Sequence, residues 1–317
     1  PAYSTLGWSN WLGGDPLLNT FIDSGEGELA RLVFHELAHQ LLYVKDDTAF
    51  NESFATAVER LGVARWMARR AGPGGADAVI AALPEWRERL EDAAKAAPGV
   101  PLASVQLLPP VARWTKTMAA PTNYRDHIAE MEAARAGAPS KMGPDIGKAG
   151  IFLKANSSVI GMNEEIPIRF PDRRNDHEAE IVVIIGKTGT DISQERALDH
   201  VAGYALGLDM TVRGPEDRSF RKSVDGYTPL GPWIVTADEI ENPDDIPFTL
   251  SVNGDKRQDS NTQHMVYSIR RLIEFASSFY TLHPGDLLYT GTPKGVGPVQ
   301  PGDVIRVNSL PQFGELR

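Results

Sequence analysis

The sequence predicts an α+β protein, with a β-rich region built on a mixed, mostly antiparallel sheet and a helical segment before it. From residue 101 onward, short β-type runs are separated by Gly, Pro, Asn and Asp, which is typical of strands joined by turns. Residues 28–70 instead carry apolar side chains at helical spacing. Only two helical stretches interrupt the β-type runs, which disfavours a doubly wound parallel sheet.

The N-terminal region is expected to be helical. A helix within residues 28–41 is apolar on nearly all sides, so we expect it to be buried. A second helix begins near Asn51, a favourable cap residue, and residues 71–75 (AGPGG) break the pattern. An Ala-rich amphipathic helix is expected within residues 76–97. We therefore divide the chain into a helical segment (1–73), a linker with an amphipathic helix (74–100) and a β-rich region (101–317).

The β-rich region contains the following expected elements. Strands are predicted at Val159–Gly161, Ala179–Gly186, Val201–Leu208, Phe248–Val252, Asp286–Tyr289 and Asp303–Val307, and helices at Tyr124–Ala136 and Met265–Phe279.

Composition excludes several classes of protein. The 317 residues carry a net charge of −10, which argues against nucleic acid or an anionic membrane as a partner. The chain has no Cys, so disulfides, thiolate zinc sites and cysteine nucleophiles are excluded. No apolar run is long enough to span a bilayer, and no signal segment opens the chain. We expect a cytoplasmic protein.

Three acidic residues lie beside the predicted buried strands. Glu178 and Glu180 adjoin the apolar run at 181–185, and alternation along a strand places both on one face. Two such carboxylates repel unless a cation or a shared proton lies between them. Asp209 follows the apolar run at 201–208. Three oxygen donors without His or Cys suit a hard cation, Mg²⁺ or alternatively Mn²⁺ or Ca²⁺. A solvated sheet edge is the other interpretation.

His127 and Glu130 lie three residues apart in the predicted helix. This spacing puts them on one face within hydrogen-bond reach. A Glu that orients a His makes it a better general base toward water. Taken alone, this spacing favours an ordinary surface pair over a catalytic one.

Several motifs, taken in their order along the chain, favour a functional site over a solvated sheet edge and an ordinary surface pair. They are NYRDHIAEM (123–131), EAE (178–180), Asp209, KSVDG (222–226), GPW (231–233), VNG (252–254), QDSNT (258–262), PGD (284–286) and TGTPKGVG (290–297). Together they resemble the fumarylacetoacetate hydrolase family over about residues 101–317. The resemblance implies a catalytic domain folded as a β-rich roll of mixed sheets, usually as a homodimer.

The resemblance also implies roles for individual residues. Mg²⁺ or Mn²⁺ would be held by Glu178, Glu180 and Asp209. His127 and Glu130 would activate water. Lys222 would be a catalytic residue that, like Lys154, contacts carboxylate or enolate oxygens of the substrate. Thr292 would bind a substrate carboxylate, and Arg213 would also bind substrate.

The activity implied is that of a divalent-metal-dependent hydrolase. It would cleave a carbon–carbon bond in β-diketo acids such as acylpyruvates and fumarylpyruvate, in the catabolism of aromatic compounds. Decarboxylation or tautomerisation of oxo acids, such as oxaloacetate or 2-hydroxymuconate-type compounds, could use the same site and is the alternative.

A separate motif lies in the N-terminal segment. His35, Glu36 and His39 form H-E-x-x-H, in which two His four residues apart can bind one Zn²⁺ and the Glu can act as base. Glu52 is a candidate third ligand. Residues 3–67 resemble the ligand-bearing helices of a gluzincin-type zinc aminopeptidase, without room for its substrate-binding sheet or oxyanion-stabilising residue. We expect a fragment that can bind zinc without hydrolysing peptides. A zinc peptidase and a non-catalytic scaffold are the alternatives.

Overall fold

A computed structural model of the chain describes residue 101 and residues 104–111, 115–134 and 146–317. The chain divides into two units, Pro1–Ser104 and Val105–Arg317, and the second is described below. The helices expected within residues 1–100 and the expected zinc residues His35, Glu36, His39 and Glu52 lie outside the described residues.

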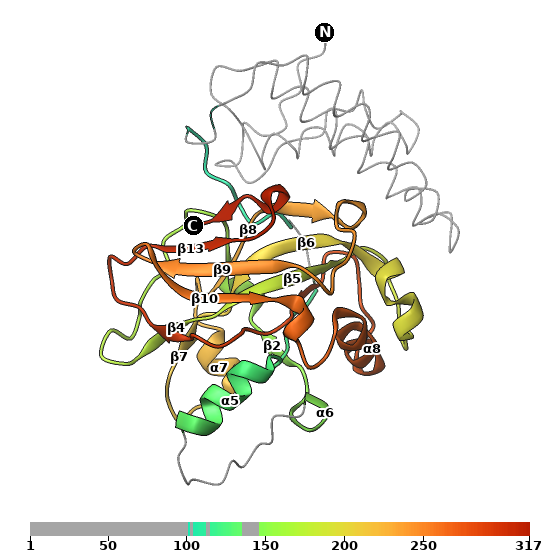
Figure 1. Cartoon of the computed structure of the whole chain (residues 1–317), viewed down its shortest axis with the longest axis horizontal. Helices are drawn as coiled ribbons and strands as arrows, with labels where there is room; N and C mark the ends of the chain where they lie inside the picture. Colours follow the sequence, from blue (N-terminus) through green and yellow to red (C-terminus); the bar gives the residue numbers. More distant parts are fainter. Residues whose placement is uncertain (1–100, 102–103, 112–114, 135–145) are drawn as a thin grey trace, which may run out of the picture. The chain divides into compact units, whose positions relative to one another are not determined.

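A seven-stranded mixed sheet forms the centre of the second unit (Figure 1). In it, β1 (Thr117–Ala119) pairs with β11 (Leu287–Tyr289), and β3 (Val159–Ile160) with β8 (Thr228–Thr236), in parallel. The other neighbouring strands are antiparallel. The predicted mixed, mostly antiparallel sheet is therefore confirmed. In spatial order the strands are β2 (Phe152–Lys154), β1 (Thr117–Ala119), β11 (Leu287–Tyr289), β5 (Ala179–Ile185), β6 (Val201–Leu208), β8 (Thr228–Thr236) and β3 (Val159–Ile160).

Two smaller sheets complete the described β-structure. Both are antiparallel throughout. One has the order β10 (Asp255–Asn261), β9 (Pro247–Val252), β13 (Ile305–Asn308) and β14 (Glu315–Leu316), and the other β12 (Gly297–Pro298), β4 (Asn175–His177) and β7 (Thr211–Val212).

The described helices are short. The longest, α8, buries Ile269, Leu272, Ile273 and Ala276 on one face, and the Ser268 hydroxyl caps its first turn by accepting from the Arg271 amide. No helix in the described ranges combines the length and apolar character needed to cross a membrane. The α-helices are α5 (Arg125–Ala134), α6 (Ile146–Ala149), α7 (Arg218–Lys222) and α8 (Ile269–Phe279); the 3₁₀ turns are η4 (Asn156–Ser158), η5 (Gln194–His200), η6 (Ala237–Glu239), η7 (Thr262–His264) and η8 (Pro311–Phe313).

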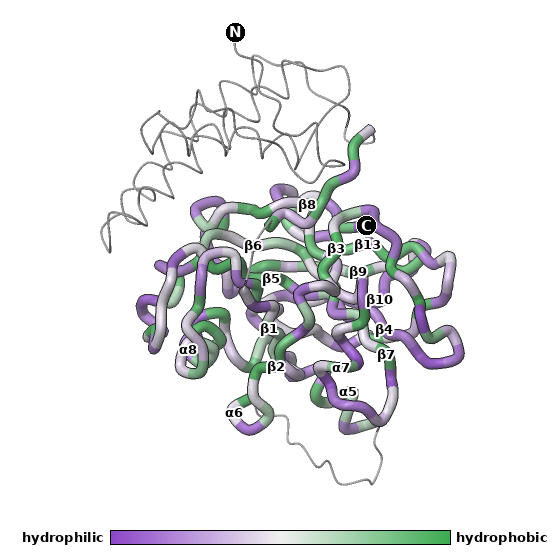
Figure 2. Tube along the Cα trace, turned by 180° about the vertical axis from the view of Figure 1, so that it is seen from behind, coloured by the Kyte–Doolittle hydropathy of each residue, from purple (hydrophilic) through white to green (hydrophobic). Residues whose placement is uncertain are grey.

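The central strand β5 is buried on both faces, which explains its continuous apolar sequence. Ile181 and Val183 belong to the larger core cluster, whereas Val182 and Ile184 belong to a second cluster. Successive side chains therefore enter two cores on opposite sides of one sheet. Figure 2 shows this apolar stretch in the interior of the unit.

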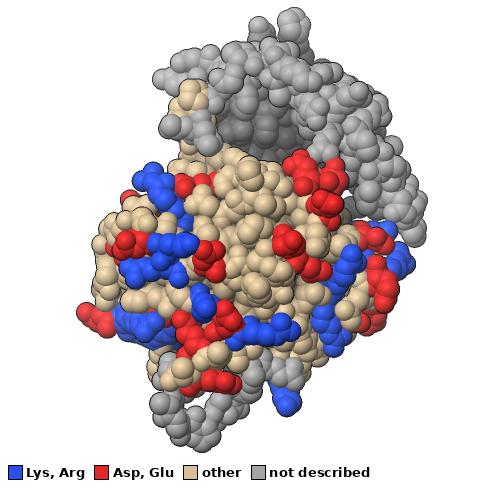
Figure 3. Space-filling model, viewed as in Figure 1, with Lys and Arg blue, Asp and Glu red and all other residues tan. Residues whose placement is uncertain are grey.

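The surface carries mixed charge. On the face drawn in Figure 3, acidic and basic side chains of the described residues lie next to one another around an uncharged centre. This face therefore has no continuous basic surface of the kind that binds a nucleic acid backbone.

Several element boundaries differ from the prediction. β6 has the predicted bounds, and β5 ends one residue early. The predicted helix start at Met265 is wrong, because Met265 pairs with Tyr124 in a β-bridge and α8 begins only at Ile269. Tyr124, the predicted first residue of α5, takes part in the same bridge, so α5 begins one residue later at Arg125. The polar strand β10 was not predicted. Most of its side chains are exposed or half-buried, so its sequence has no alternation of apolar and polar residues.

Candidate metal and substrate site

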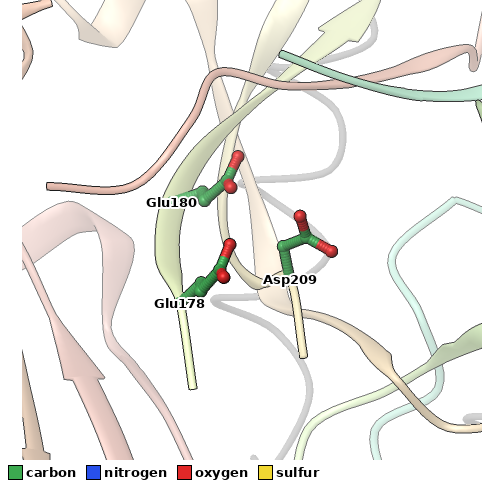
Figure 4. Close-up of side chains that lie close together, drawn as sticks. All are labelled: Glu178, Glu180 and Asp209. Carbon is green, nitrogen blue, oxygen red and sulfur yellow. The ribbon is translucent and has the colours of Figure 1, made fainter. Parts of the chain in front are cut away.

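Three buried carboxylates lie together at the end of the β5–β6 pair. Antiparallel pairing of these strands sets Ala179 opposite Leu208, and the Asp209 amide donates to the Glu178 carbonyl oxygen at 2.8 Å. Glu178, Glu180 and Asp209 each offer an oxygen within 4.8 Å of the others. Figure 4 shows the three carboxylates converging on a common space. The sequence therefore placed all three acids correctly.

Two lysines lie against this cluster. The Lys222 ammonium donates to Glu178 and to Asp209, both at 2.7 Å, and to the Thr211 hydroxyl at 2.6 Å. The Lys154 ammonium donates to Asp209 at 2.5 Å and to the Tyr227 carbonyl oxygen at 2.9 Å. Asp209 is thus neutralised from both sides.

Glu178 and Glu180 have different electrostatic surroundings. Burial works against ionisation of Glu178, but attraction by Lys222 and Arg213 outweighs it and lowers the pKa of Glu178. Burial raises the pKa of Glu180 well above its ordinary value, and repulsion by Asp209 adds to this. A cation among the three oxygens would favour the ionised form of Glu180. Three carboxylates without His or Cys are the donor set that Mg²⁺ and Mn²⁺ prefer, so the residues present fit such an ion.

His127 and Glu130 are neighbours on α5, as the spacing predicted. The distance from Nδ1 of His127 to Oε2 of Glu130 is 3.1 Å, and His127 is 7% exposed. The Glu130 carboxylate also accepts from the Gly295 amide at 3.0 Å, which ties α5 to the loop after β11. This anchoring and the burial of the imidazole exclude a freely solvated surface pair. Nδ1 is engaged, so Nε2 is the ring nitrogen left for a water or substrate.

A cavity of about 130 Å³ lies beside these groups. Its volume is similar to that of an engineered cavity, about 150 Å³, that holds benzene, so it suits a small organic acid. The residues that line it are Ala120, Pro121, Thr122, His127, Met131, Phe152, Glu178, Glu180, Asp209, Arg213, Arg218, Arg221, Lys222 and Thr292.

The remaining expected substrate contacts lie at the site with existing partners. Arg213 donates to Asp176 at 2.6 Å and to Glu178 at 3.2 Å. The Thr292 hydroxyl donates to the Ala179 carbonyl oxygen at 2.9 Å and accepts from Gln258 at 2.8 Å. Lys154 contacts Asp209 from outside the cavity lining. The roles assigned to these residues in substrate binding stay predictions.

Sequence reasoning missed two basic cavity residues, Arg218 and Arg221, both on α7. The signal that could have pointed to Arg218 is its spacing, because it lies four residues before the expected site residue Lys222. On a helix, this spacing puts the two side chains on one face. A helix of five residues is too short to show periodicity, so this spacing could not be recognised.

Comparison with known proteins agrees with this geometry. Residues 116–317 match the family model "Fumarylacetoacetate (FAA) hydrolase C-terminal". The maleylpyruvate hydrolase of Aquipseudomonas alcaligenes is 51% identical over 233 residues, covering 73% of this chain and 81% of the relative. The chain belongs to the fumarylacetoacetate hydrolase family. Residues 1–97 of this family member match a second family model, described as "Putative aminopeptidase".

Solved structures of family members share the fold. The maleylpyruvate hydrolase of Sphingobium sp. SYK-6, in complex with manganese(II) and pyruvate, is 38% identical, with a TM-score of 0.64 over 77% of this chain and 84% of that one. The 5-carboxymethyl-2-hydroxymuconate delta-isomerase of Mycobacterium smegmatis is 36% identical, with a TM-score of 0.57 over 69% of this chain and 83% of that one. The expected mixed-sheet fold of this family is therefore confirmed.

Proposed function

We propose that the chain is a divalent-metal-dependent hydrolase that cleaves a carbon–carbon bond of acylpyruvates in the catabolism of aromatic compounds. The observation that carries this proposal is that the carboxylate cluster and His127, whose Nδ1 is held by Glu130, line one small cavity. A 2-oxo acid bound at the cluster would then have a candidate base beside it. The similarity to maleylpyruvate hydrolases, one of them with manganese and pyruvate, supports this activity.

The cation, Mg²⁺ or Mn²⁺, would be held by Glu178, Glu180 and Asp209. When bound, it would supply the positive charge that stabilises an enolate as the carbon–carbon bond breaks. Lys222 donates to two of these carboxylates, so its positive charge lies close to the place where an enolate or carboxylate oxygen of the substrate would bind.

His127 would accept a proton from water through Nε2 while Glu130 holds Nδ1. The hydroxide so formed adds to the acyl carbonyl carbon. The bond to the neighbouring methylene carbon then breaks, its electron pair leaves as the enolate of pyruvate, and the acyl part leaves as a carboxylic acid. Protonation of the enolate carbon gives pyruvate, so one water is consumed for each bond cleaved.

A second candidate is an oxo-acid tautomerase or decarboxylase that uses the same carboxylates. The similarity to a delta-isomerase of 5-carboxymethyl-2-hydroxymuconate favours keeping it. Such reactions need an enolate to be stabilised but no water to be activated, so they depend less on His127.

Assays of one purified preparation would test these functions. The substrates assayed with Mg²⁺ or Mn²⁺ are acetylpyruvate, maleylpyruvate and oxaloacetate. An aminoacyl anilide is assayed with Zn²⁺. We expect metal-dependent release of pyruvate from both acylpyruvates, and loss of the activity with EDTA. Turnover of oxaloacetate alone would favour the second candidate, and turnover of the anilide alone would overturn both.

We also propose several finer properties of the chain. These are a homodimer located in the cytoplasm, with residues 101–317 as the catalytic domain and residues 1–73 as an aminopeptidase-like fragment. Light scattering of the purified chain tests the dimer. The zinc site at His35, His39 and Glu52 is a prediction from the HELAH motif, and measuring bound zinc in wild type and His35→Ala tests it.

A further inference from the structure

Arg218 and Lys222 occupy the two ends of α7, four residues apart and therefore on one face of the helix. Both cations lie close to the same aromatic ring of Phe152. The guanidinium carbon of Arg218 is 5.5 Å from the ring centroid, and the ammonium of Lys222 is 5.8 Å from it. Lys222 contacts the carboxylate cluster, and Arg218 and Lys222 line the same cavity as that cluster.

The other basic side chains around the cavity are already occupied. Lys222 and Lys154 donate to carboxylates of the cluster, and Arg213 is paired with Asp176 and Glu178. Arg221 donates to the carbonyl oxygens of residues 216 and 212. Each of these groups therefore already has hydrogen-bond acceptors within the protein.

Arg218 differs from them. Its guanidinium lines the cavity, is half-buried, and has no hydrogen-bond acceptor among the residues that the structure describes. Burial lowers the pKa of this side chain, and attraction by Glu178 does not offset the lost hydration. A partly desolvated guanidinium with open donors is a favourable place for a carboxylate, which it can bind through two parallel hydrogen bonds.

We propose that Arg218 binds a second carboxylate, at the acyl end of the substrate, and so makes the site selective for dicarboxylic acylpyruvates. The proposal rests on the proposed function, in which the 2-oxo acid end lies at Glu178, Glu180 and Asp209. The substrate then extends from the cluster past Phe152 to Arg218. The cavity of about 130 Å³ limits the molecule between these points to a short chain.

Binding of two unreactive acids tests this without requiring turnover. The acids 2-oxoheptanedioate and 2-oxoheptanoate have the same chain length and differ only in a terminal carboxylate or methyl group. Neither has the second oxo group needed for cleavage. Calorimetric titration in Mg²⁺ should show wild type binding the diacid about 10- to 100-fold more tightly, the range for hydrogen bonds to a charged group.

Two variants and a control assign the preference to Arg218. Arg218→Gln should reduce the preference for the diacid to less than about threefold, and Arg218→Lys should retain part of it because the charge remains. Arg196→Gln is the matched control, because Arg196 is exposed and only weakly paired, at 3.7 Å, with Asp199. It should bind both acids as wild type does.

Steady-state kinetics supply the second measurement. Arg218→Gln should lower kcat/KM for maleylpyruvate about 10- to 100-fold and change that for acetylpyruvate less than about threefold. The proposal would be overturned if Arg218→Gln lost kcat/KM equally on both substrates. It would also be overturned if wild type showed no preference for binding the diacid, or if Arg218→Gln kept that preference. If wild type prefers the diacid through Arg218 but cleaves neither substrate, the proposed function fails while the assignment of Arg218 stands.

Discussion

Lys222 donates a hydrogen bond of 2.7 Å to Glu178, so an ammonium group already lies against a carboxylate that would hold the cation. Both side chains are almost fully buried. The positive charge offsets repulsion among the three acids when no cation is present, and it competes with a cation for the same oxygens. Stability and metal affinity are therefore coupled at this position.

Lys222→Met should destabilise the metal-free protein by about 3–5 kcal/mol, because it removes the ammonium that pairs with two buried carboxylates. Added Mg²⁺ or Mn²⁺ should restore more stability to this variant than to wild type. Urea unfolding with and without metal measures both effects. Lys256→Met is the control, because Lys256 forms an exposed ion pair with Asp259 and its loss should cost less than about 1 kcal/mol. Equal stabilisation of both variants by metal would contradict the coupling.

Replacing any one of Glu178, Glu180 and Asp209 by Ala should abolish metal-dependent turnover while leaving the protein folded. Loss of Glu180 also removes the repulsion that acts on the cluster, so the metal-free Glu180→Ala variant should be at least as stable as wild type. Activity assays after chelation and return of Mg²⁺, with circular dichroism, measure this. Glu132→Ala, on the exposed side of α5, should keep its activity. Wild-type activity in all three variants would exclude the cluster as the site.

His127→Ala should lower the rate of acylpyruvate cleavage by about 10²–10⁴-fold, the usual range for loss of a general base. Decarboxylation of oxaloacetate, where it occurs, should fall much less, because it needs no activated water. Parallel kinetics on the two substrates give the comparison. Equal losses would mean that His127 shapes the cavity instead of activating water, and an unchanged cleavage rate would remove it from the mechanism.

Asp286 should control part of the stability at acid pH. Its buried carboxylate accepts from the Thr115 amide at 3.0 Å, from the Lys116 amide at 2.9 Å and from the His283 amide at 2.8 Å. Burial alone would raise the pKa of Asp286, but hydrogen bonds from Lys116 and Thr115 outweigh it and lower the pKa below the ordinary 3.8. The stabilisation is therefore fully present above that value and is lost as the pH falls through the lowered pKa.

Asp286→Asn should accordingly lower the free energy of unfolding at neutral pH by about 2–4 kcal/mol, since one charged acceptor of several hydrogen bonds is lost. The difference from wild type should narrow as the pH falls below about 4. Denaturant unfolding between pH 7 and pH 3 measures it. Asp255→Asn is the control, because Asp255 is exposed. A difference that stays constant over this range would show that the carboxylate charge does not stabilise the fold.

Local spacing was enough to predict much of the site. Alternation along a strand is a property of the backbone, so Glu178 and Glu180 could be placed on one face from the sequence. Helical spacing did the same for His127 and Glu130. The order of the motifs then indicated the family, which the comparisons confirm.

Which groups meet across the site was decided only by the tertiary structure. The pairing of β5 with β6 brings Asp209 to the two Glu, and α7 brings Lys222 into the cluster. The partners of Arg213 and the open donors of Arg218 follow from the same packing. Both side chains are arginines from one short stretch of sequence, and nothing in their local spacing distinguishes them. Their difference arises because hydrogen-bond partners and burial depend on residues distant in the chain, which sequence periodicity does not encode.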